Sequence, residues 1–249
     1  MRKRGAWDGM LAIAYFNWPF YVAALLMLAA STAGLGAGGY LAPGSGLIAL
    51  GCLWFLIGSL GVSHWVYDRS DLYKWSWLSA ALTGKNLQHI VLCHSGFDEA
   101  SEMLKPLFPA ATWTVLDHFD AAVMTEASIR RARRRFPPAP ATIPANYNSW
   151  PIAGGTQNVV LSLLAIHELR TVEERVAWFR EAGRCLAPDG SVVLVEHVRD
   201  LANFAAFGPG FLHFHSIPSW RISWETAGLI QSRHFRITPF VRVFVLTSK

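Results

Sequence analysis

Charged residues are scarce in this chain of 249 residues: Asp, Glu, Lys and Arg make up 16% of it, against 52% hydrophobic residues. From Gly9 to Tyr67 none of the four occurs. A typical soluble domain is about 25% charged, so the composition argues against an ordinary soluble enzyme. Because charge returns at a normal density after Tyr67, the sequence predicts a membrane segment joined to a soluble domain.

Cysteine is also rare, with Cys52, Cys93 and Cys185 far apart and no C-x-x-C pair among them. This spacing argues against a disulfide framework and against a zinc site built from cysteines. It favours the reducing cytoplasm as the compartment of the soluble part.

Two uncharged stretches, Trp18 to Gly38 and Leu47 to Trp65, each approach the ~20 residues that cross a bilayer as a helix. The Gly- and Pro-containing stretch 39–46 leaves room for a tight turn, which predicts a helical hairpin. Basic residues at positions 2–4 place both ends of the hairpin in the cytoplasm, so we expect a protein of the cytoplasmic (inner) membrane whose domain faces the cytoplasm. A cleaved signal peptide over residues 1–38 is the alternative, but it leaves the second stretch unexplained.

The expected domain order is a transmembrane hairpin over residues 1–66, an interfacial linker helix over 67–84 and an α/β domain over 85–249. The linker mixes aromatic and charged side chains, as segments at the lipid headgroups do. It is either an aromatic anchor alone or the roof of a substrate pocket that opens toward lipid. Gly34 and Gly38 have the spacing that lets two spans pack closely.

From about residue 85, short β-branched runs alternate with longer helical patterns, which is typical of a parallel sheet covered on both faces. The sequence therefore predicts an α/β fold with a Rossmann-like, doubly wound, mostly parallel sheet and an antiparallel hairpin at its C-terminal edge. The expected strands are His89–Cys93, Thr112–Asp117, Ala141–Ala145, Val159–Leu163, Ser191–Glu196, Arg236–Thr238 and Val241–Thr247. The expected helices are Glu99–Leu107, Ala121–Phe136 and Thr171–Cys185, the last with a capping-box spacing at its start.

Local patterns in this domain suggest a family. Leu116-Asp117 closes the second expected strand, Glu168-Leu169-Arg170 follows the fourth, and the stretch from Glu181 to Glu196 holds Arg-Cys-Leu-Ala-Pro-Asp-Gly at a helix-to-strand step. From Lys85 to Lys249 the chain thus resembles the class I S-adenosylmethionine-dependent methyltransferases, specifically the ubiquinone-biosynthesis-like, type 11 group. The resemblance implies S-adenosylmethionine (SAM) as the cofactor.

The chain departs from that family at the glycine-rich turn after the first strand. The matching stretch, from Leu92 to Glu99, keeps only one of the glycines. The resemblance still implies a cofactor site at this edge of the sheet, where open α/β sheets bind ligands. The residues it implies are Ser95, Gly96, Asp98 for the ammonium group, Asp117 for the ribose hydroxyls, and Asn146. Asp98 and Glu99 can equally serve as favourable charges at a helix N-terminus, and Asp117 as a turn residue.

Methyl transfer is an in-line displacement that needs a base only if the acceptor loses a proton. The candidates for that role are His167 and Glu168 after the fourth strand, His197 after the fifth, and His215 in the aromatic insertion from Phe204 onward. Capping, core and packing roles are the alternatives for each. His213 and His215 would face one side of an extended segment, but no acidic or cysteine partner stands at a recognisable spacing, so no metal is expected.

The function that fits these features is a membrane-anchored SAM-dependent methyltransferase acting on a lipophilic small-molecule or lipid acceptor. We expect that acceptor to enter between Tyr67–Trp77 and Phe204–His215. Membrane lipids are the expected partners of the arginine run 129–135, which otherwise is a solvated helix face, and no nucleic acid is expected. A non-catalytic, membrane-bound SAM- or nucleotide-binding scaffold is the alternative. A dinucleotide oxidoreductase is a third possibility, although no G-x-G-x-x-G turn follows an expected strand.

Overall fold

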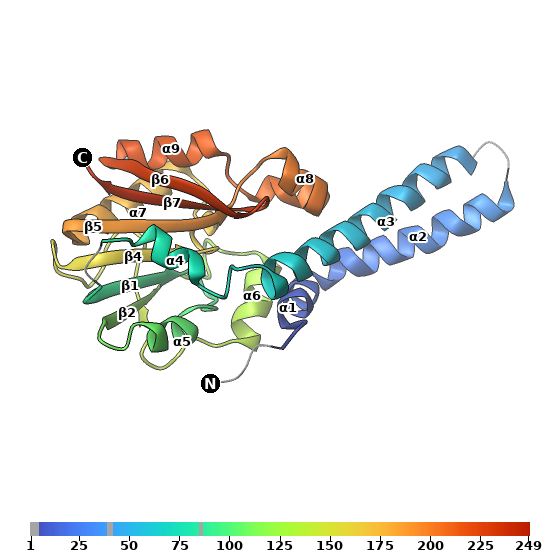
Figure 1. Ribbon diagram of the computed structural model, residues 1–249. Helices are drawn as coiled ribbons and strands as arrows, with labels where there is room; N and C mark the ends of the chain where they lie inside the picture. Colours follow the sequence, from blue (N-terminus) through green and yellow to red (C-terminus); the bar gives the residue numbers. More distant parts are fainter. Residues whose placement is uncertain (1–4, 39–41, 85–86) are drawn as a thin grey trace.

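A seven-stranded sheet in the order β3-β2-β1-β4-β5-β7-β6 forms the centre of the α/β part of the computed structural model, which describes residues 5–38, 42–84 and 87–249 (Figure 1). The first five strands in this order are parallel, and β7 pairs antiparallel with both β5 and β6. The predicted mostly parallel, doubly wound sheet with an antiparallel edge hairpin is therefore confirmed. The strands are β1 (His89–His94), β2 (Thr112–Asp117), β3 (Ile143–Pro144), β4 (Gln157–Leu163), β5 (Leu186–His197), β6 (Leu229–Thr238) and β7 (Val241–Ser248).

Helices cover both faces of the sheet, and each face has its own core (Figure 1). On one face α7 (Val172–Cys185) and α9 (Ile217–Thr226) bury Trp178, Trp220 and Trp224. On the other, α4 (Ser76–Ala81) and α5 (Ser101–Leu104), which continues as the 3₁₀ turn η3 (Lys105–Leu107), bury Trp77 and Leu104. This two-sided burial explains why the central strands read as almost continuous apolar runs.

The start of α7 confirms the predicted capping box. The hydroxyl of Thr171 accepts the backbone N–H of Glu174 at 3.1 Å, and the Glu174 carboxylate accepts the backbone N–H of Thr171 at 2.8 Å. Two donors that the first turn leaves unpaired are thereby satisfied.

Several predicted bounds were wrong. The third strand shrinks to Ile143–Pro144, because the N–H of Thr142 closes a turn by donating to the carbonyl of Ala139 at 2.9 Å. Helix α6 (Ala127–Arg135) begins six residues later than expected, after a turn in which Asp120 accepts the N–H of Ala122 at 2.8 Å. The aromatic insertion was not assigned a helix, yet it forms α8 (Leu201–Phe207) and the 3₁₀ helix η5 (Gly208–His213), and α9 follows it.

The uncharged region forms α1 (Asp8–Phe16), α2 (Trp18–Ala37) and α3 (Ala42–His64), and α3 continues as one π-helical turn, η2 (Trp65–Arg69). Residues 42–46 of the expected turn belong to α3 instead, which begins at Ala42 and takes up Pro43 in its first turn, where a missing N–H costs nothing. Residues 39–41 and the basic residues 2–4 lie outside the described ranges. Helices α2 and α3 approach closely at Gly34, where an added Cβ would lie 2.6 Å from the Oγ of Ser45.

The hairpin of α2 and α3 projects away from the sheet (Figure 1). Among the described residues, two helical stretches are long and apolar enough to cross a membrane, Trp18–Gly36 with a mean hydropathy of 1.5 and Pro43–Arg69 with 2.0. Only 17% of each is buried within the chain, so neither is a core helix of the α/β part.

The segment after the hairpin differs from the expected interfacial helix. Trp75 and Trp77 are each 7% exposed, and Leu72 is fully buried, all three within the core between α4 and the sheet. These side chains are therefore held by the sheet rather than presented to a headgroup layer.

Candidate functional site

A cavity of about 1180 Å³ lies between the carboxyl ends of the strands and the N-terminal helices. This volume exceeds the ~300–1,000 Å³ of typical ligand pockets, so the cavity has room for more than one ligand. Its walls come from the turns after β1, β4 and β5, from α6 and η5, and from α1 with the near ends of α2 and α3. Its members include Ser95, Asp98, His167, Glu168, His197, Tyr67, Phe207, Leu212, His213, Phe20, Tyr21, Phe55 and Ser59.

Helix α1 closes one side of this cavity, a role that was not foreseen from the sequence. The ring of Phe16 meets Phe97, just beyond the β1 turn, with centroids 5.4 Å apart. At the other end of the helix, the carboxylate of Asp68 accepts the N–H groups of Gly9 and Met10 at 2.6 and 3.0 Å. Asp68 follows the second apolar stretch in the chain, so this cap ties α1 to the end of the hairpin.

The expected cofactor residues divide into two groups. Ser95 and Asp98 line the cavity, whereas Gly96, Asp117 and Asn146 are not among its lining residues. The carboxylate of Asp98 also caps α5 by accepting the N–H groups of Ala100 and Ser101 at 3.1 and 2.9 Å. Asp98 thus fills the helix N-terminal role and faces the cavity at the same time.

Gly96 and Asp117 are joined directly. Gly96 has φ +90°, in the region that favours glycine, and its N–H donates to Oδ1 of Asp117 at 2.8 Å. The other oxygen of this buried carboxylate pairs with the guanidinium of Arg133 on α6. Phe119 covers the open side of the glycine, where an added Cβ would lie 2.8 Å from its ring.

This arrangement allows a test of the fit to SAM. The hydroxyl of Ser95 is buried at the cavity wall and has no hydrogen-bond partner among the described residues, so it can pair with a ligand. By the resemblance noted in the sequence, the methionine part of the cofactor is expected at this turn and its ribose at Asp117. The adenosine side, in contrast, is filled by Arg133 and Phe119. The residues present would therefore hold the cofactor only with the side chains of Arg133 and Phe119 moved away.

His167, after β4, is held by a buried carboxylate. Its Nδ1 lies 2.8 Å from Oε2 of Glu196, and Oε1 of that residue accepts the N–H groups of Ala165 and His167 at 3.1 and 3.3 Å. Glu196 is fully buried, at the end of β5. With the Nδ1 proton donated to Glu196, Nε2 of His167 carries a lone pair beside the cavity.

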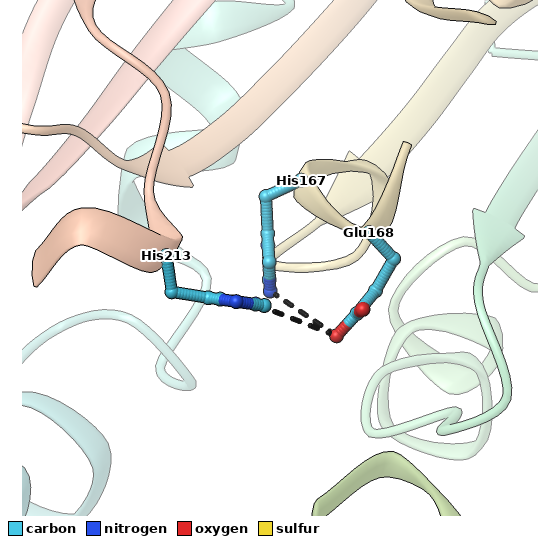
Figure 2. A group of neighbouring side chains, drawn as sticks. All are labelled: His167, Glu168 and His213. Carbon is cyan, nitrogen blue, oxygen red and sulfur yellow. Dashed lines mark ion pairs between the residues drawn. The ribbon is translucent and has the colours of Figure 1, made fainter. Parts of the chain in front are cut away.

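The fold brings His213 next to His167 and Glu168 in the turn after β4 (Figure 2). Nε2 of His213 and Nε2 of His167 lie 3.6 and 3.7 Å from the same Oε1 of Glu168, and Nδ1 of His213 lies 3.2 Å from Oε1 of Glu126. Burial alone would lower the pKa of His213, but its bonds to Glu126 and Glu168 outweigh it and raise the pKa to about 9. Burial likewise would raise the pKa of Glu168, but the hydrogen bond from His213 and the charges of the two histidines outweigh it, so this pKa is lowered. The acidic partners that the sequence did not offer His213 are therefore supplied by distant parts of the chain.

The remaining two candidates are held differently. Nε2 of His197 lies 2.9 Å from the hydroxyl of Tyr67, and its Nδ1 lies 2.9 Å from the carbonyl of Phe240. Burial lowers the pKa of His197 to about 4, so it is neutral and positions Tyr67 at the cavity wall. His215 is not itself a lining residue: its Nε2 lies 3.1 Å from the carbonyls of residues 167 and 169, behind the cavity wall. The segment is not extended, since η5 ends at His213, so the two histidines do not face one side. Burial and Arg175 lower the pKa of His215 to about 3.

Comparison with known structures identifies proteins of similar fold. No family model and no curated protein matches the chain. A SAM-dependent methyltransferase from Aquifex aeolicus matches with a TM-score of 0.51 and 14% identity, over 71% of this chain and 89% of that one. This chain has a methyltransferase-like fold. The mitomycin 7-O-methyltransferase MmcR matches with a TM-score of 0.57 and 16% identity, over 99% of this chain and 74% of that one, so the match includes the N-terminal helices. At these identities the likeness is one of fold.

Proposed function

We propose that this protein is a methyltransferase that moves the methyl group of SAM to an apolar acceptor at the membrane surface. The observation that carries the proposal is the position of the cavity. On one side it meets the carboxyl ends of the strands of a methyltransferase-like sheet, the edge at which open α/β sheets bind their ligands. On the other side it meets helices with large exposed apolar surfaces.

The cofactor would lie along the ends of β1 and β2. Ser95, Gly96 and Asp98 would hold its methionine part, and Asp117 and Asn146 its ribose and adenine side. Bound SAM supplies a sulfonium whose methyl group is open to attack. Asp117 would bind the ribose hydroxyls after Arg133, whose side chain is 30% exposed, moves its guanidinium into solvent.

The acceptor would have an apolar body and one polar group. Phe20 and Phe55 of the hairpin and Leu212 of η5 line the cavity with apolar side chains. The polar groups gather at the wall made by His167, Glu168 and His213. Nε2 of His167 can take the proton of a hydroxyl there, a role worth ~10²–10⁴-fold in rate for a general base.

The hairpin would hold the protein in the membrane, with both ends and the α/β domain in the cytoplasm. Leu47 and Ile57 of α3 are 73% and 71% exposed. Large apolar side chains that gather on an exposed surface favour contact with lipid or a partner over contact with water. Helix α8 rests on α3, where Nε1 of Trp54 donates to the carbonyl of Ala205 at 3.0 Å, and its Leu201 is 84% exposed. The exposed arginines Arg134 and Arg135 of α6 would contact anionic headgroups. Release of the full chain into the supernatant of carbonate-washed membranes would contradict this anchoring.

The domain boundaries follow from the same proposal. Residues 1–66 would form the membrane part, 67–84 the connection, and 85–249 the methyltransferase domain.

A non-catalytic SAM-binding scaffold is the second candidate, favoured by one observation. Arg133 and Phe119 fill the adenosine side of a turn that has a single glycine, so the site as it stands is closed. Such a protein would bind SAM without forming a product.

The experiment that tests the proposal compares lipid and small-molecule extracts of cells that express the full chain with those of cells that express Asp117→Asn. Mass spectrometry should find a compound that gains the mass of one CH₂ with the wild-type chain and not with the variant. SAM binding without any such compound would favour the scaffold. Absence of both binding and product, from a folded protein, would refute the proposal.

A further inference from the structure

We propose that His167, Glu168 and His213 form a binding site for one divalent transition-metal ion, such as Zn²⁺, in the wall of the cavity. The three side chains come from the turn after β4 and from the end of η5, and they point toward one another (Figure 2). One donor atom from each lies within 4.8 Å of the other two. All three residues also line the cavity.

The donor atoms are of the kind such an ion prefers. Nε2 of each histidine lies 3.6–3.7 Å from Oε1 of Glu168. With bonds of ~2.0–2.2 Å, donors around tetrahedral zinc stand roughly 3.4 Å apart, so two of the three pairs are close to the required separation. Two imidazole nitrogens and one carboxylate favour zinc, iron or cobalt over magnesium or calcium.

The surroundings of both histidines match those of metal ligands. Nδ1 of His167 faces the carboxylate of Glu196 at 2.8 Å, and Nδ1 of His213 faces that of Glu126 at 3.2 Å. A ligating histidine almost always donates its other ring N–H to such a group, which fixes the tautomer and raises the basicity of the ligand. If only one histidine acted, as a proton acceptor, only its ring would need a carboxylate at Nδ1. A metal bound by both histidines explains why both rings have one.

The two segments that carry the ligands are also held together. Nη1 of Arg170 donates to the backbone carbonyl of His167 at 3.0 Å and to that of His213 at 2.6 Å. Three carboxylates, those of Glu126, Glu168 and Glu196, surround the two rings. Without a metal, the protonated ring of His213 offsets part of this charge. A divalent cation at the meeting point of the donors would displace the Nε2 proton of His213 and balance the carboxylates in its place.

The role of the ion rests on the proposed function. Three protein ligands leave a position open toward the cavity, as in catalytic zinc sites. An oxygen of the acceptor would occupy it. With the ion bound, Nε2 of His167 is a ligand and no longer accepts the proton; the ion itself would make a hydroxyl at the open position easier to deprotonate, its proton leaving to water. The acceptor class is thereby narrowed to apolar molecules that carry an oxygen group.

The test is a titration of the full-length, EDTA-treated protein in detergent with Co²⁺, followed by visible absorption and by competition with Zn²⁺. We expect one Co²⁺ per chain. His167→Gln and His213→Gln should each weaken binding by at least about 100-fold, a loss larger than that of a supporting residue. His89→Gln, the same change at an exposed histidine at the start of β1, should leave binding unaltered.

A further variant guards against loss of the fold. Glu126 is 48% exposed, so Glu126→Gln should fold normally and weaken Co²⁺ binding ~10–100-fold as a supporting residue does. Wild-type binding no tighter than that of His213→Gln, or equal binding by all variants, would overturn the site. Methyl transfer by a chain that binds no Co²⁺ would refute the metal site alone, and Co²⁺ binding without methyl transfer would refute the proposed function alone.

Discussion

Replacing Glu196 with Gln should remove the function of His167 while keeping the shape of the site. The two carboxylate oxygens accept three N–H groups, two from the backbone through Oε1 and one from Nδ1 of His167 through Oε2. The amide of the Glu196→Gln variant would have one acceptor oxygen and one NH₂ group. In either orientation the NH₂ group would face an N–H donor, either the two backbone N–H groups or the Nδ1–H of His167. The arrangement that keeps the backbone bonds moves the ring proton from Nδ1 to Nε2, and the lone pair beside the cavity is lost.

The size of the effect follows from the bonds that change. A hydrogen bond to a charged group contributes ~1.5–3 kcal/mol, and this is the expected loss in the free energy of unfolding. In the metal-free protein, loss of His167 as the general base lowers the rate of methyl transfer by ~10²–10⁴-fold. Loss of the supporting carboxylate lowers Co²⁺ affinity by ~10–100-fold.

The assay compares the variant with the wild type and with Glu173→Gln, which makes the same change at an exposed position of α7. Urea unfolding, the methyl-transfer rate and Co²⁺ binding are measured on all three full-length proteins. If Glu196→Gln kept the rate and the Co²⁺ affinity of the control, the assigned tautomer of His167 would be wrong.

Three other changes test other parts of the structure. Gly34→Val should destabilise the hairpin by about 1–3 kcal/mol, because the new side chain would meet Ser45. The control Gly36→Val should not, since a Cβ at Gly36 meets nothing within 4 Å. Thermal unfolding in detergent measures both, and equal effects would contradict the helix packing. Burial lowers the pKa of His118 to about 4, so below pH about 6.5 the unfolded chain takes up a proton that the folded chain excludes, and the free energy of unfolding should fall toward pH 4. In His118→Phe this fall of the free energy of unfolding with pH should be shallower by up to ~1.4 kcal/mol per pH unit. An unchanged slope would refute the prediction. Phe16→Ala should loosen α1 and raise its amide hydrogen exchange while the exchange of β1 stays constant, and protection of α1 equal to that of the wild type would show that this ring does not hold the helix.

Local patterns in the sequence were enough for the larger part of the fold. The central strands are apolar runs of strand length, the capping box marks α7, and the hairpin is visible as a stretch without charge. These features depend on residues near one another in the chain. The missed α1 depends on a distant residue, because its start is capped by Asp68, some sixty positions away. Local signals exist, with Asp8 in its first turn and Asn17 at its C-cap, but they stand beside a long uncharged stretch whose apolar pattern has no break.

The candidate site was predicted in part for a similar reason. His167 and Glu168 follow a strand whose end lies at the ligand edge of the sheet, so their position could be inferred. The approach of His213 to Glu168 and Glu126 depends on how η5 and α6 fold over that edge, which no sequence spacing records. The closure of Asp117 by Arg133 is likewise a contact between separate elements, and it is visible only in the folded chain.

Calorimetric titration of the full-length protein in lipid nanodiscs with SAM tests the central claim most directly. We predict one binding site per chain and an affinity that falls about 10–100-fold in Asp117→Asn, since the ribose hydroxyls would lose a charged acceptor worth ~1.5–3 kcal/mol. A folded wild-type chain that gives no heat of binding, or an Asp117→Asn variant that binds SAM as tightly as the wild type, would contradict the assignment of this sheet edge as the cofactor site.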